Sequence, residues 1–451
     1  MICKIPRVIA LAYLSFSLTC CVGENADPLL GDIPLIATHF GTKGRYEEVN
    51  TYLINDPLAV NETLIRLPSS ECSAIHLLTV IRHGTRDPTN KNAKKMTDFY
   101  NLVLSNASNW LQKVGLSQWK MWYTEDMDGR LVEKGRMDHT NLAMRLAKSF
   151  PTLVTEHNLR NGHIKFVTSS THRCINSTIA FQRGLKKSFG IEGEDYDYEV
   201  NDALMRFFEK CDRFVVEVDK NKSAVVQLEH FLSGPEMKRI YEKMADRLQV
   251  PYPAITADMA EAAFYLCAYE FAIKTINSPW CQLFDDVDAQ VMEYAGDLKH
   301  YWKKSYGHEI NSKSSCVLFR DLFNRLDQAA NDRRSGKVYE AVTVQVGHAE
   351  TLIPLLTLLG LFKDVDPLTS TNFATQTGRV FRSGRIVPYA SNLVLVLYDC
   401  PEGLRLETRL NEQPLMLPKM DTHLPLFEDV KRNYAKLLQG CDQKAVCDLP
   451  E

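Results

Sequence analysis

The stretch Ile75–Pro88, IHLLTVIRHGTRDP, changes character abruptly in its middle. Its first half is an apolar run with β-branched residues, and Gly84 follows soon after that run ends. A short apolar run closed by glycine predicts a buried strand and its exit loop. Ligands of open α/β sheets bind at the carboxyl ends of strands, so we expect chemistry at this loop. Its polar residues Arg82, His83 and Arg86 place two guanidiniums around one imidazole, which favours an anion-binding site over a solvated basic loop.

Length and composition indicate a globular protein with more than one lobe. The 451 residues exceed what one compact core usually holds. The formal net charge of −3 lacks the strong basic excess that is typical of nucleic-acid-binding proteins. We therefore expect no nucleic-acid partner, and any attraction for anions must be local.

The N-terminus carries a predicted secretory signal peptide at residues 1–23. Lys4 and Arg7 precede an apolar run from Val8 to Leu18, and small residues follow near the expected cleavage site. That run is too short to span a bilayer, and polar residues interrupt the later apolar stretch 341–362, so we predict no transmembrane span. The expected location is the secretory pathway, either extracellular or in the lumen of the endoplasmic reticulum.

Cysteines and glycosylation sequons agree with this route. Of the twelve cysteines, three lie in the signal peptide and nine follow it, which predicts disulfides and at least one unpaired thiol. Sequons of the form N-x-S/T occur at Asn61, Asn106, Asn176 and Asn221. Asn176 is the least expected glycan site of the four, because it follows Arg173 closely and its helix turn would have to face outward.

The order of predicted elements indicates an α/β frame interrupted by helices. Residues 24–71 form an irregular lead-in that we expect to wrap around the outside of the fold. The α/β catalytic domain is expected at 72–200 and 335–451, with a mainly helical lobe inserted at 201–334. Strands separated by helical connections point to parallel βαβ units. After the first strand, the predicted strands are Ile164–Thr168, Ala341–Val346 and, as the last one, Asn392–Tyr398.

Two of these strands also end in polar residues. Ile164–Thr168 continues into SSTHR, which ends at Arg173, and Ala341–Val346 continues into GHAE, which contains His348 and Glu350. A histidine and a carboxylate at a strand-to-helix junction can meet both an anion and the positive end of a helix. Taken alone, Glu350 is better explained by the acidic preference of a first helical turn than by catalysis. The repetition at three strand ends favours one shared site.

These motifs resemble the histidine acid phosphatase family. RHGTRDP and GHAE resemble the family's first and last motifs, SSTHRCINS at 169–177 is similar to its second arginine motif, and LVEKGR at 131–136 is similar to a family turn and helix. The glutamate of the HAE tripeptide, where many relatives carry His-Asp, resembles the multiple inositol polyphosphate phosphatase branch. The resemblance runs from about Ile75 to Cys447. It implies a phosphoglycerate-mutase-like histidine phosphatase α/β domain with an inserted, mainly helical lobe.

The resemblance also implies a role for each motif residue. His83 would be the nucleophile and Glu350 the proton donor, and the phosphoryl oxygens would be bound by Arg82, Arg86, Arg173 and His348. In-line displacement spreads negative charge over those oxygens, which fixed guanidiniums stabilise. Attack requires a neutral imidazole, and general acid catalysis requires a protonated carboxyl group. Because arginines neutralise the charge, we expect no metal and no cofactor.

The implied activity is phosphomonoester hydrolysis of inositol polyphosphates, inositol hexakisphosphate and lower, through a phosphohistidine. Removal of the 3-phosphate of 2,3-bisphosphoglycerate is a further implied activity. Lys299, Lys303 and Lys304 are candidates for binding outer phosphates, although a solvated helix face explains each of them singly. Asp87 stands where many relatives have an aromatic residue, and its carboxylate would disfavour highly phosphorylated substrates.

Two alternatives remain open. A broad-specificity secreted acid phosphatase would share every catalytic residue and differ in the pocket lining. A non-catalytic secreted binding protein of the same fold is the second, although intact motifs argue against it. By resemblance, the disulfides would be Cys72–Cys400, Cys267–Cys281 and Cys441–Cys447, which leaves Cys174, Cys211 and Cys316 unassigned.

Overall fold

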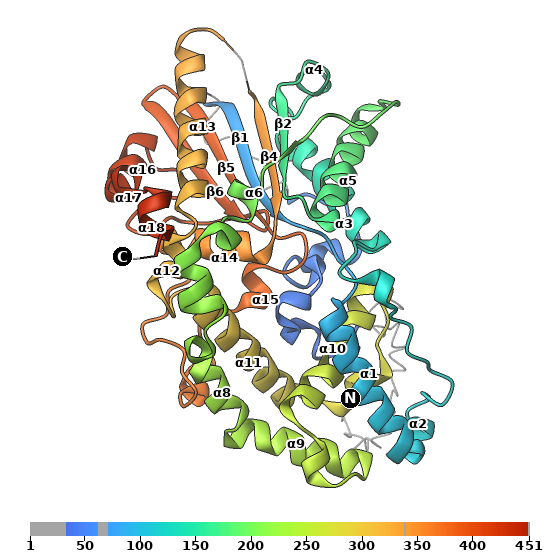
Figure 1. Cartoon of the computed structure of the whole chain (residues 1–451). Helices are drawn as coiled ribbons and strands as arrows, with labels where there is room; N and C mark the ends of the chain where they lie inside the picture. Colours follow the sequence, from blue (N-terminus) through green and yellow to red (C-terminus); the bar gives the residue numbers. More distant parts are fainter. Residues whose placement is uncertain (1–32, 62–70, 338–339, 450–451) are drawn as a thin grey trace, which may run out of the picture.

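The computed structural model describes residues 33–61, 71–337 and 340–449. A sheet covered by helices forms one part of the molecule, and a group of helices forms the other (Figure 1). The predicted signal peptide, residues 1–23, lies outside the described residues. Within them, no helix is both long and apolar enough to cross a membrane.

The sheet has seven strands in the order β3-β2-β4-β1-β5-β6-β7. They are β1 (Ser73–Arg82), β2 (Ile164–Thr168), β3 (Glu199–Val200), β4 (Val342–Gly347), β5 (Asn392–Cys400), β6 (Gly403–Leu410) and β7 (Gln413–Pro414). The first four strands run parallel to one another, as the βαβ pattern predicts. β5, β6 and β7 pair antiparallel, and the expectation that β5 is the last strand is wrong. Only two residues separate β5 from β6, which is enough for a hairpin and far too short for a crossover.

β1 lies at the centre of the sheet because both of its faces are apolar. Leu78 and Val80 belong to one hydrophobic cluster, whereas Leu77 and Ile81 belong to another on the opposite face. The helices α3 (Glu133–Ser149) and α5 (His172–Phe189) cover one face. α13 (Cys316–Arg334) and α14 (Ala349–Leu358) cover the other (Figure 1). Alternating residues of one strand thus hold together two helical layers.

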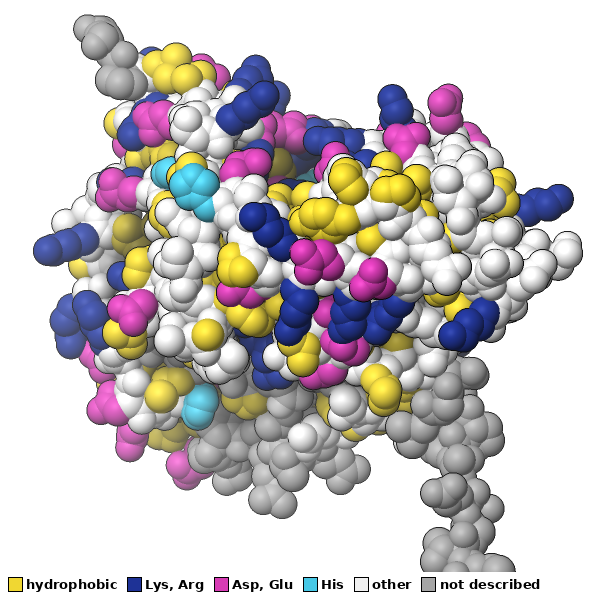
Figure 2. Space-filling model, turned by 90° about the horizontal axis from the view of Figure 1, so that it is seen from below, with side chains coloured by type: hydrophobic (Ala, Val, Ile, Leu, Met, Phe, Trp, Pro, Cys, Tyr) yellow, Lys and Arg dark blue, Asp and Glu magenta, His cyan; other side chains and the backbone are white. Residues whose placement is uncertain are grey.

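The second part is helical, and it draws on more than one segment of the chain. α1 (Asn90–Asn106) packs against α10 (Ala257–Lys274), beside α11 (Asp286–Lys304) (Figure 1). The other helices around it are α2 (Ser108–Lys113), α8 (Val226–Leu232), α9 (Pro235–Leu248) and α12 (Glu309–Lys313). Figure 2 views the molecule from this end, where lysines and arginines are interspersed with acidic side chains. No single sign of charge dominates this face.

The remaining helices are short. They are α4 (Glu156–Arg160), α6 (Asp202–Met205), α7 (Asp212–Phe214), α15 (Ser383–Ile386), α16 (Phe427–Asn433), α17 (Ala435–Gly440) and α18 (Gln443–Cys447). The described lead-in contains short 3-10 turns, including η2 (Ala37–His39) and η3 (Gly41–Lys43).

Residues 36–50 of the lead-in are mostly buried, which contradicts the expectation that it wraps around the outside, whereas residues 54–61 are partly or fully exposed. The Phe40 ring packs edge-on against the rings of Phe264 and Phe271 in α10. Tyr46 is also buried, and its hydroxyl donates to Glu412 at 2.8 Å. Aromatic residues of this segment give it an apolar surface that favours burial between the two parts.

The cysteines form four disulfides in the described ranges, and one expected pair is wrong. Cys72–Cys400 and Cys267–Cys281 are present as expected. The expected Cys441–Cys447 bridge is replaced by Cys316–Cys441 and Cys211–Cys447. Cys447, at the end of α18, is bonded to Cys211, which directly precedes α7. Cys441, which precedes α18, is bonded to Cys316 at the start of α13. Cys174 is the unpaired thiol that the odd number required, and it is buried.

The sequon asparagines differ in their surroundings. Asn61, Asn106 and Asn221 are exposed. The Asn176 side chain donates to the His172 carbonyl at 2.8 Å, and Thr178 of its sequon is fully buried. The environment of Asn176 is therefore the least suited of the four to carry a glycan.

Candidate active site

The three motif-bearing strands lie side by side and end at the same edge of the sheet. Arg82 at the end of β1 is in register with Gly347 of β4, and Thr168 of β2 is in register with Val346. The order β2-β4-β1 therefore gathers the loops that follow these strands. All six predicted site residues meet there, namely Arg82, His83, Arg86, Arg173, His348 and Glu350.

His83 presents one ring nitrogen to the site. Its Nδ1 lies 2.9 Å from the Gly84 carbonyl, which can only accept, so Nδ1 carries the proton and Nε2 keeps its lone pair. Burial and the neighbouring Arg173 and Arg82 guanidiniums hold the pKa of His83 well below its usual value. The imidazole is therefore neutral at acidic pH, with Nε2 available for nucleophilic attack.

His348 is neutral as well, and both its nitrogens have partners. Arg173 donates from Nη2 to Nδ1 at 3.3 Å, so the ring proton lies on Nε2, which donates to Ser169 Oγ at 2.9 Å. Burial and the Arg173 charge lower the pKa of His348 to about 3. The rings of His83 and His348 lie edge to face, with centroids 5.7 Å apart. In this arrangement His348 orients the Arg173 guanidinium.

The three arginines have donors that no described residue accepts. Nη1 of Arg82 donates to the carbonyls of Thr42 at 2.8 Å and Val387 at 2.7 Å, which fixes the guanidinium in place. The Nε atoms of Arg82, Arg86 and Arg173 are buried and have no acceptor among the described residues. A buried N–H group without an acceptor costs free energy of folding, so three of them around one histidine indicate an anion-binding site.

Glu350 reaches the site from the first turn of α14 and is paired with a lysine of the helical part. Lys304 Nζ, at the end of α11, donates to its Oε1 at 2.6 Å. Desolvation by itself would raise the pKa of Glu350, but the charge and the hydrogen bond of Lys304 hold it well below its usual value. The carboxyl group is therefore ionised in this arrangement.

The loop that follows β1 contacts α3 closely at two glycines, Gly84 in the loop and Gly135 in the helix. A Cβ on Gly135 would lie 2.0 Å from the Thr85 carbonyl oxygen, and one on Gly84 would lie 2.2 Å from the Gly135 carbonyl oxygen. Asp138 accepts from the Thr85 backbone N–H at 2.9 Å, and His139 Nε2 lies 3.0 Å from the Arg82 carbonyl oxygen. The LVEKGR segment therefore provides a close backbone contact that only glycine allows.

Sequence analysis missed Asp138 and His139, although they had a detectable signal. They follow Gly135 at the i+3 and i+4 positions, so they lie on the same helix face. Ser177 and Cys174 on α5 were missed as supports of the loop. Ser177 Oγ accepts from the Gly84 N–H at 3.1 Å, and the Cys174 thiol donates to the Gly347 carbonyl at 3.2 Å.

The three lysines predicted to bind outer phosphates each pair with a different carboxylate. Lys303 pairs with Asp219 at 3.2 Å and Lys304 with Glu350, while Lys299 is half-exposed and lies 3.6 Å from Glu261. All three candidate lysines thus have carboxylate partners, and Lys299 has the longest ion pair.

Lys43 was not predicted from the sequence. Its Nζ donates to the Thr42 hydroxyl at 3.2 Å and lies 4.8 Å from the centre of the Tyr265 ring. No carboxylate of the described residues lies within ion-pair distance of it. Burial, Lys299 and the catalytic arginines lower the pKa of Lys43 well below its usual value. Because the adjacent Thr42 carbonyl accepts from Arg82, Lys43 lies beside that arginine.

Asp87 lies directly beside the arginines. It is buried, and its backbone carbonyl accepts from Arg86 Nη1 at 2.6 Å. Burial raises the pKa of Asp87 to about 6, against the opposing effect of Arg86. Its carboxyl group is therefore mostly ionised at neutral pH and becomes protonated at mildly acidic pH.

Comparison with known proteins gives the family. The family model of the histidine phosphatase superfamily (branch 2) matches residues 75–414. Multiple inositol polyphosphate phosphatase 1 of Gallus gallus is 44% identical, covering 92% of this chain and 93% of the relative. The protein of that name from Homo sapiens is 43% identical, covering 98% and 94%.

Solved structures agree with this fold. The multiple inositol polyphosphate phosphatase of Bifidobacterium longum, in complex with inositol hexasulfate, has a TM-score of 0.69 at 14% identity, covering 89% of this chain and 97% of that chain. The phytase from D. castellii has a TM-score of 0.74 at 15% identity, covering 94% and 90%. The family match and the relatives at over 40% identity agree with the motifs and with the site at the strand ends. The chain therefore belongs to the histidine phosphatase superfamily, branch 2.

Proposed function

We propose that this protein is a phosphomonoesterase that hydrolyses inositol polyphosphates, inositol hexakisphosphate and lower, through a phosphohistidine intermediate. The observation that carries this proposal is a neutral, buried His83 with a free Nε2 among three arginines whose Nε atoms lack acceptors. The relatives named multiple inositol polyphosphate phosphatase 1, at 43–44% identity, support the substrate class.

The first step forms the phosphohistidine. His83 Nε2 attacks phosphorus while the bond between phosphorus and the ester oxygen breaks, and guanidiniums of Arg82, Arg86 and Arg173 neutralise the oxygens. His348 keeps Arg173 oriented through Nδ1. The Nε2–H group of His348 donates to Ser169. It must leave that partner before His348 can donate to a phosphoryl oxygen.

Glu350 supplies the proton for the leaving oxygen. The carboxyl group is ionised in the free enzyme because of Lys304, but an incoming phosphate adds negative charge nearby and raises the pKa again. Glu350 then takes up a proton and delivers it to the departing alkoxide. In the second step its carboxylate accepts a proton from the water that attacks phosphorus, and His83 is released.

The remaining phosphates of a polyphosphorylated substrate need cations outside the arginine cluster. Lys43 is suited to this role because it lies beside Arg82 and lacks a carboxylate partner among the described residues. Lys299, on α11, is the second candidate, since its ion pair is long and its side chain is half-exposed. Hydrolysis of 2,3-bisphosphoglycerate, which carries fewer phosphates, belongs to the same proposal.

The proposed location is the secretory pathway, with the signal peptide removed after Gly23. The four disulfides support an oxidising compartment. Exposed Asn61, Asn106 and Asn221 are the proposed glycan sites.

The test is phosphate release from inositol hexakisphosphate by the purified protein, beside release from p-nitrophenyl phosphate. We expect turnover of the hexakisphosphate that disappears in His83→Ala and persists in His157→Ala, a change of an exposed histidine outside the site. Turnover of the aryl ester alone would favour a broad-specificity acid phosphatase. Absence of both activities in folded protein would contradict the enzyme and leave a binding protein.

A further inference from the structure

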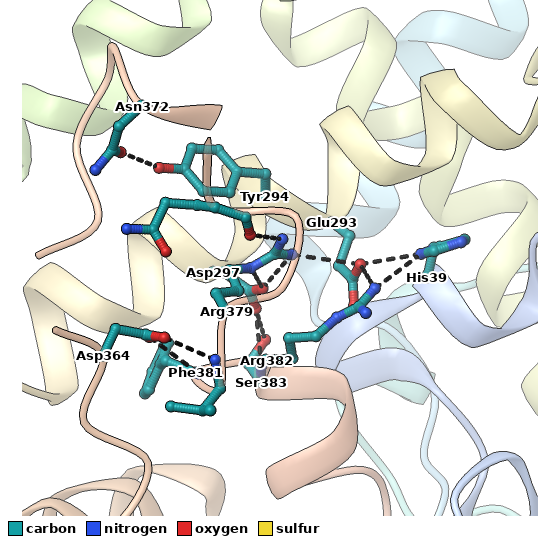
Figure 3. A network of polar contacts seen from close by, with 12 residues as sticks. His39, Glu293, Tyr294, Asp297, Asp364, Asn372, Arg379, Phe381, Arg382 and Ser383 are labelled. Carbon is teal, nitrogen blue, oxygen red and sulfur yellow. Dashed lines mark hydrogen bonds and ion pairs between the residues drawn. The ribbon is translucent and has the colours of Figure 1, made fainter. Parts of the chain in front are cut away.

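A row of polar side chains lies along one face of α11, in the helical part. Glu293, Asp297, His300 and Lys304 follow each other at helical spacing, so they project from the same side. Glu293 and Asp297 are buried, which is costly for a carboxylate unless its oxygens are paired. Figure 3 shows the residues that pair with them.

The two buried carboxylates bind two different segments of the chain. Glu293 accepts from His39 Nδ1 at 2.9 Å, at the end of η2, and from Arg382 Nε at 3.1 Å (Figure 3). Asp297 accepts from Arg379 Nε at 2.9 Å and from the Ser383 backbone N–H and hydroxyl at 2.8 and 2.7 Å. α11 thus holds both the lead-in and the segment that contains α15.

These two segments are pressed together next to the active site. A Cβ on Gly384 would lie 2.9 Å from Gly41 Cα, so the backbones touch where side chains are absent. Just beyond this contact, each segment provides one of the two carbonyls that hold Arg82, from Thr42 and from Val387. The Val387 N–H donates back to the Ser383 carbonyl at 2.9 Å, so fixing Ser383 also fixes Val387.

The same helix face also reaches the substrate-protonating group. His300 Nε2 lies 3.4 Å from the Thr42 hydroxyl, and Lys304 pairs with Glu350. One face of one helix therefore contacts the supports of Arg82 and the carboxyl group of Glu350. It lies in the helical part, away from every family motif in the sequence.

We propose that Asp297 and Glu293 are positioning residues, which set the Arg82 guanidinium for phosphate binding through Ser383, His39 and the Thr42 and Val387 carbonyls. This inference rests on the proposed function, because it assumes that Arg82 binds the phosphoryl group. A carbonyl that moves takes its hydrogen-bonded guanidinium with it, and small misplacements of a charge-stabilising group reduce catalysis strongly.

The test compares Asp297→Asn with Glu340→Gln. Asparagine keeps an oxygen for Ser383 but loses the charge that pairs with Arg379. Glu340 pairs with Arg325 at 2.9 Å near the start of β4, at the opposite edge of the sheet from the site, so its variant matches the charge change. Ser383→Ala, which removes only the hydroxyl contact, is the milder second variant.

The readouts are the inhibition constant of inorganic phosphate and the separate kcat and KM values for p-nitrophenyl phosphate. We expect Asp297→Asn to raise the phosphate inhibition constant about 10-fold or more, with a smaller increase in Ser383→Ala and no change in Glu340→Gln. Asp297→Glu, which restores the charge, should recover part of the loss.

Two outcomes separate this inference from the proposed function. Wild-type protein that neither binds phosphate nor hydrolyses either ester contradicts the function itself. Active wild-type protein whose phosphate inhibition constant is unchanged in Asp297→Asn and Ser383→Ala overturns the positioning role alone. If Asp297→Asn does not fold, Ser383→Ala decides by the same criterion.

Discussion

Lys304 sets the protonation of the proposed acid, Glu350. Replacement of Lys304 by methionine removes the positive charge that lowers the Glu350 pKa, so that pKa rises and the carboxyl group stays protonated to higher pH. Because the acid works in its protonated form, the alkaline limb of the kcat profile should move to higher pH. The measurement is kcat against pH with inositol hexakisphosphate, beside Lys303→Met, whose lysine pairs with Asp219. An alkaline limb that stays in place or moves to lower pH would contradict this assignment.

Lys43 allows the substrate class to be tested at one side chain. In Lys43→Met, kcat/KM for inositol hexakisphosphate should fall roughly 10- to 100-fold, the worth of a charged hydrogen bond. The loss for p-nitrophenyl phosphate, which has no outer phosphate, should be clearly smaller. Lys303→Met is the matched control. Equal losses on both esters would show that Lys43 serves the reacting phosphate or the fold and not an outer phosphate.

At the scale of elements, the contact between α3 and the loop that follows β1 leaves no room for a side chain at Gly135. Gly135→Ala places a methyl group 2.0 Å from the Thr85 carbonyl, so α3 must move. We expect a lower free energy of unfolding, by about 1–3 kcal/mol, together with a loss of activity.

Gly296→Ala, in α11, is the matched control, because a Cβ there meets nothing within 4 Å. It should raise the free energy of unfolding by about 0.5–1 kcal/mol and leave activity unchanged. Urea denaturation of both variants, with activity measured in parallel, is the experiment. Equal stability of Gly135→Ala and wild type would show that the loop and helix separate easily.

The elements that the sequence predicts well are those with a local signal. β1, β2 and β4 are short apolar runs that are followed by polar residues, and the structure has them at the expected positions. β6 and β7 lack such a signal, since their residues are largely mixed in polarity and pair only because β5 reverses direction. Local periodicity does not encode a partner strand.

The same distinction applies to the candidate site. Arg82 and His83 are predictable from the sequence because they share one motif. Asp138 is predictable from its spacing of three residues from Gly135. Lys43 and Asp297 had no such signal, because their relation to Arg82 exists only after segments that are distant in the sequence come together. Tertiary contacts of this kind leave no trace in a single sequence.

At the scale of the whole molecule, three of the four disulfides in the described ranges join segments that are far apart in the chain. Cys211–Cys447 closes a sequence separation of 236 residues and Cys316–Cys441 one of 125. Mass spectrometry of peptides from non-reduced protein should find these two links and no Cys441–Cys447 link. Replacement of both Cys211 and Cys447 by serine should destabilise the fold by roughly 2–5 kcal/mol, seen as a lower Tm. A Cys441–Cys447 peptide in active protein would contradict this pairing.

The central position of β1 has a consequence for how the protein is made. Its neighbours in the sheet, β4 and β5, are translated only about 260 and 310 residues later. At a synthesis rate of about 5–20 residues per second, β1 spends roughly a quarter of a minute to a minute with both edges unpaired. Exposed apolar strand edges favour aggregation, so we expect chaperones to increase the yield of folded protein. Heterologous production should therefore succeed best in hosts whose secretory chaperones are abundant and whose growth temperature is low.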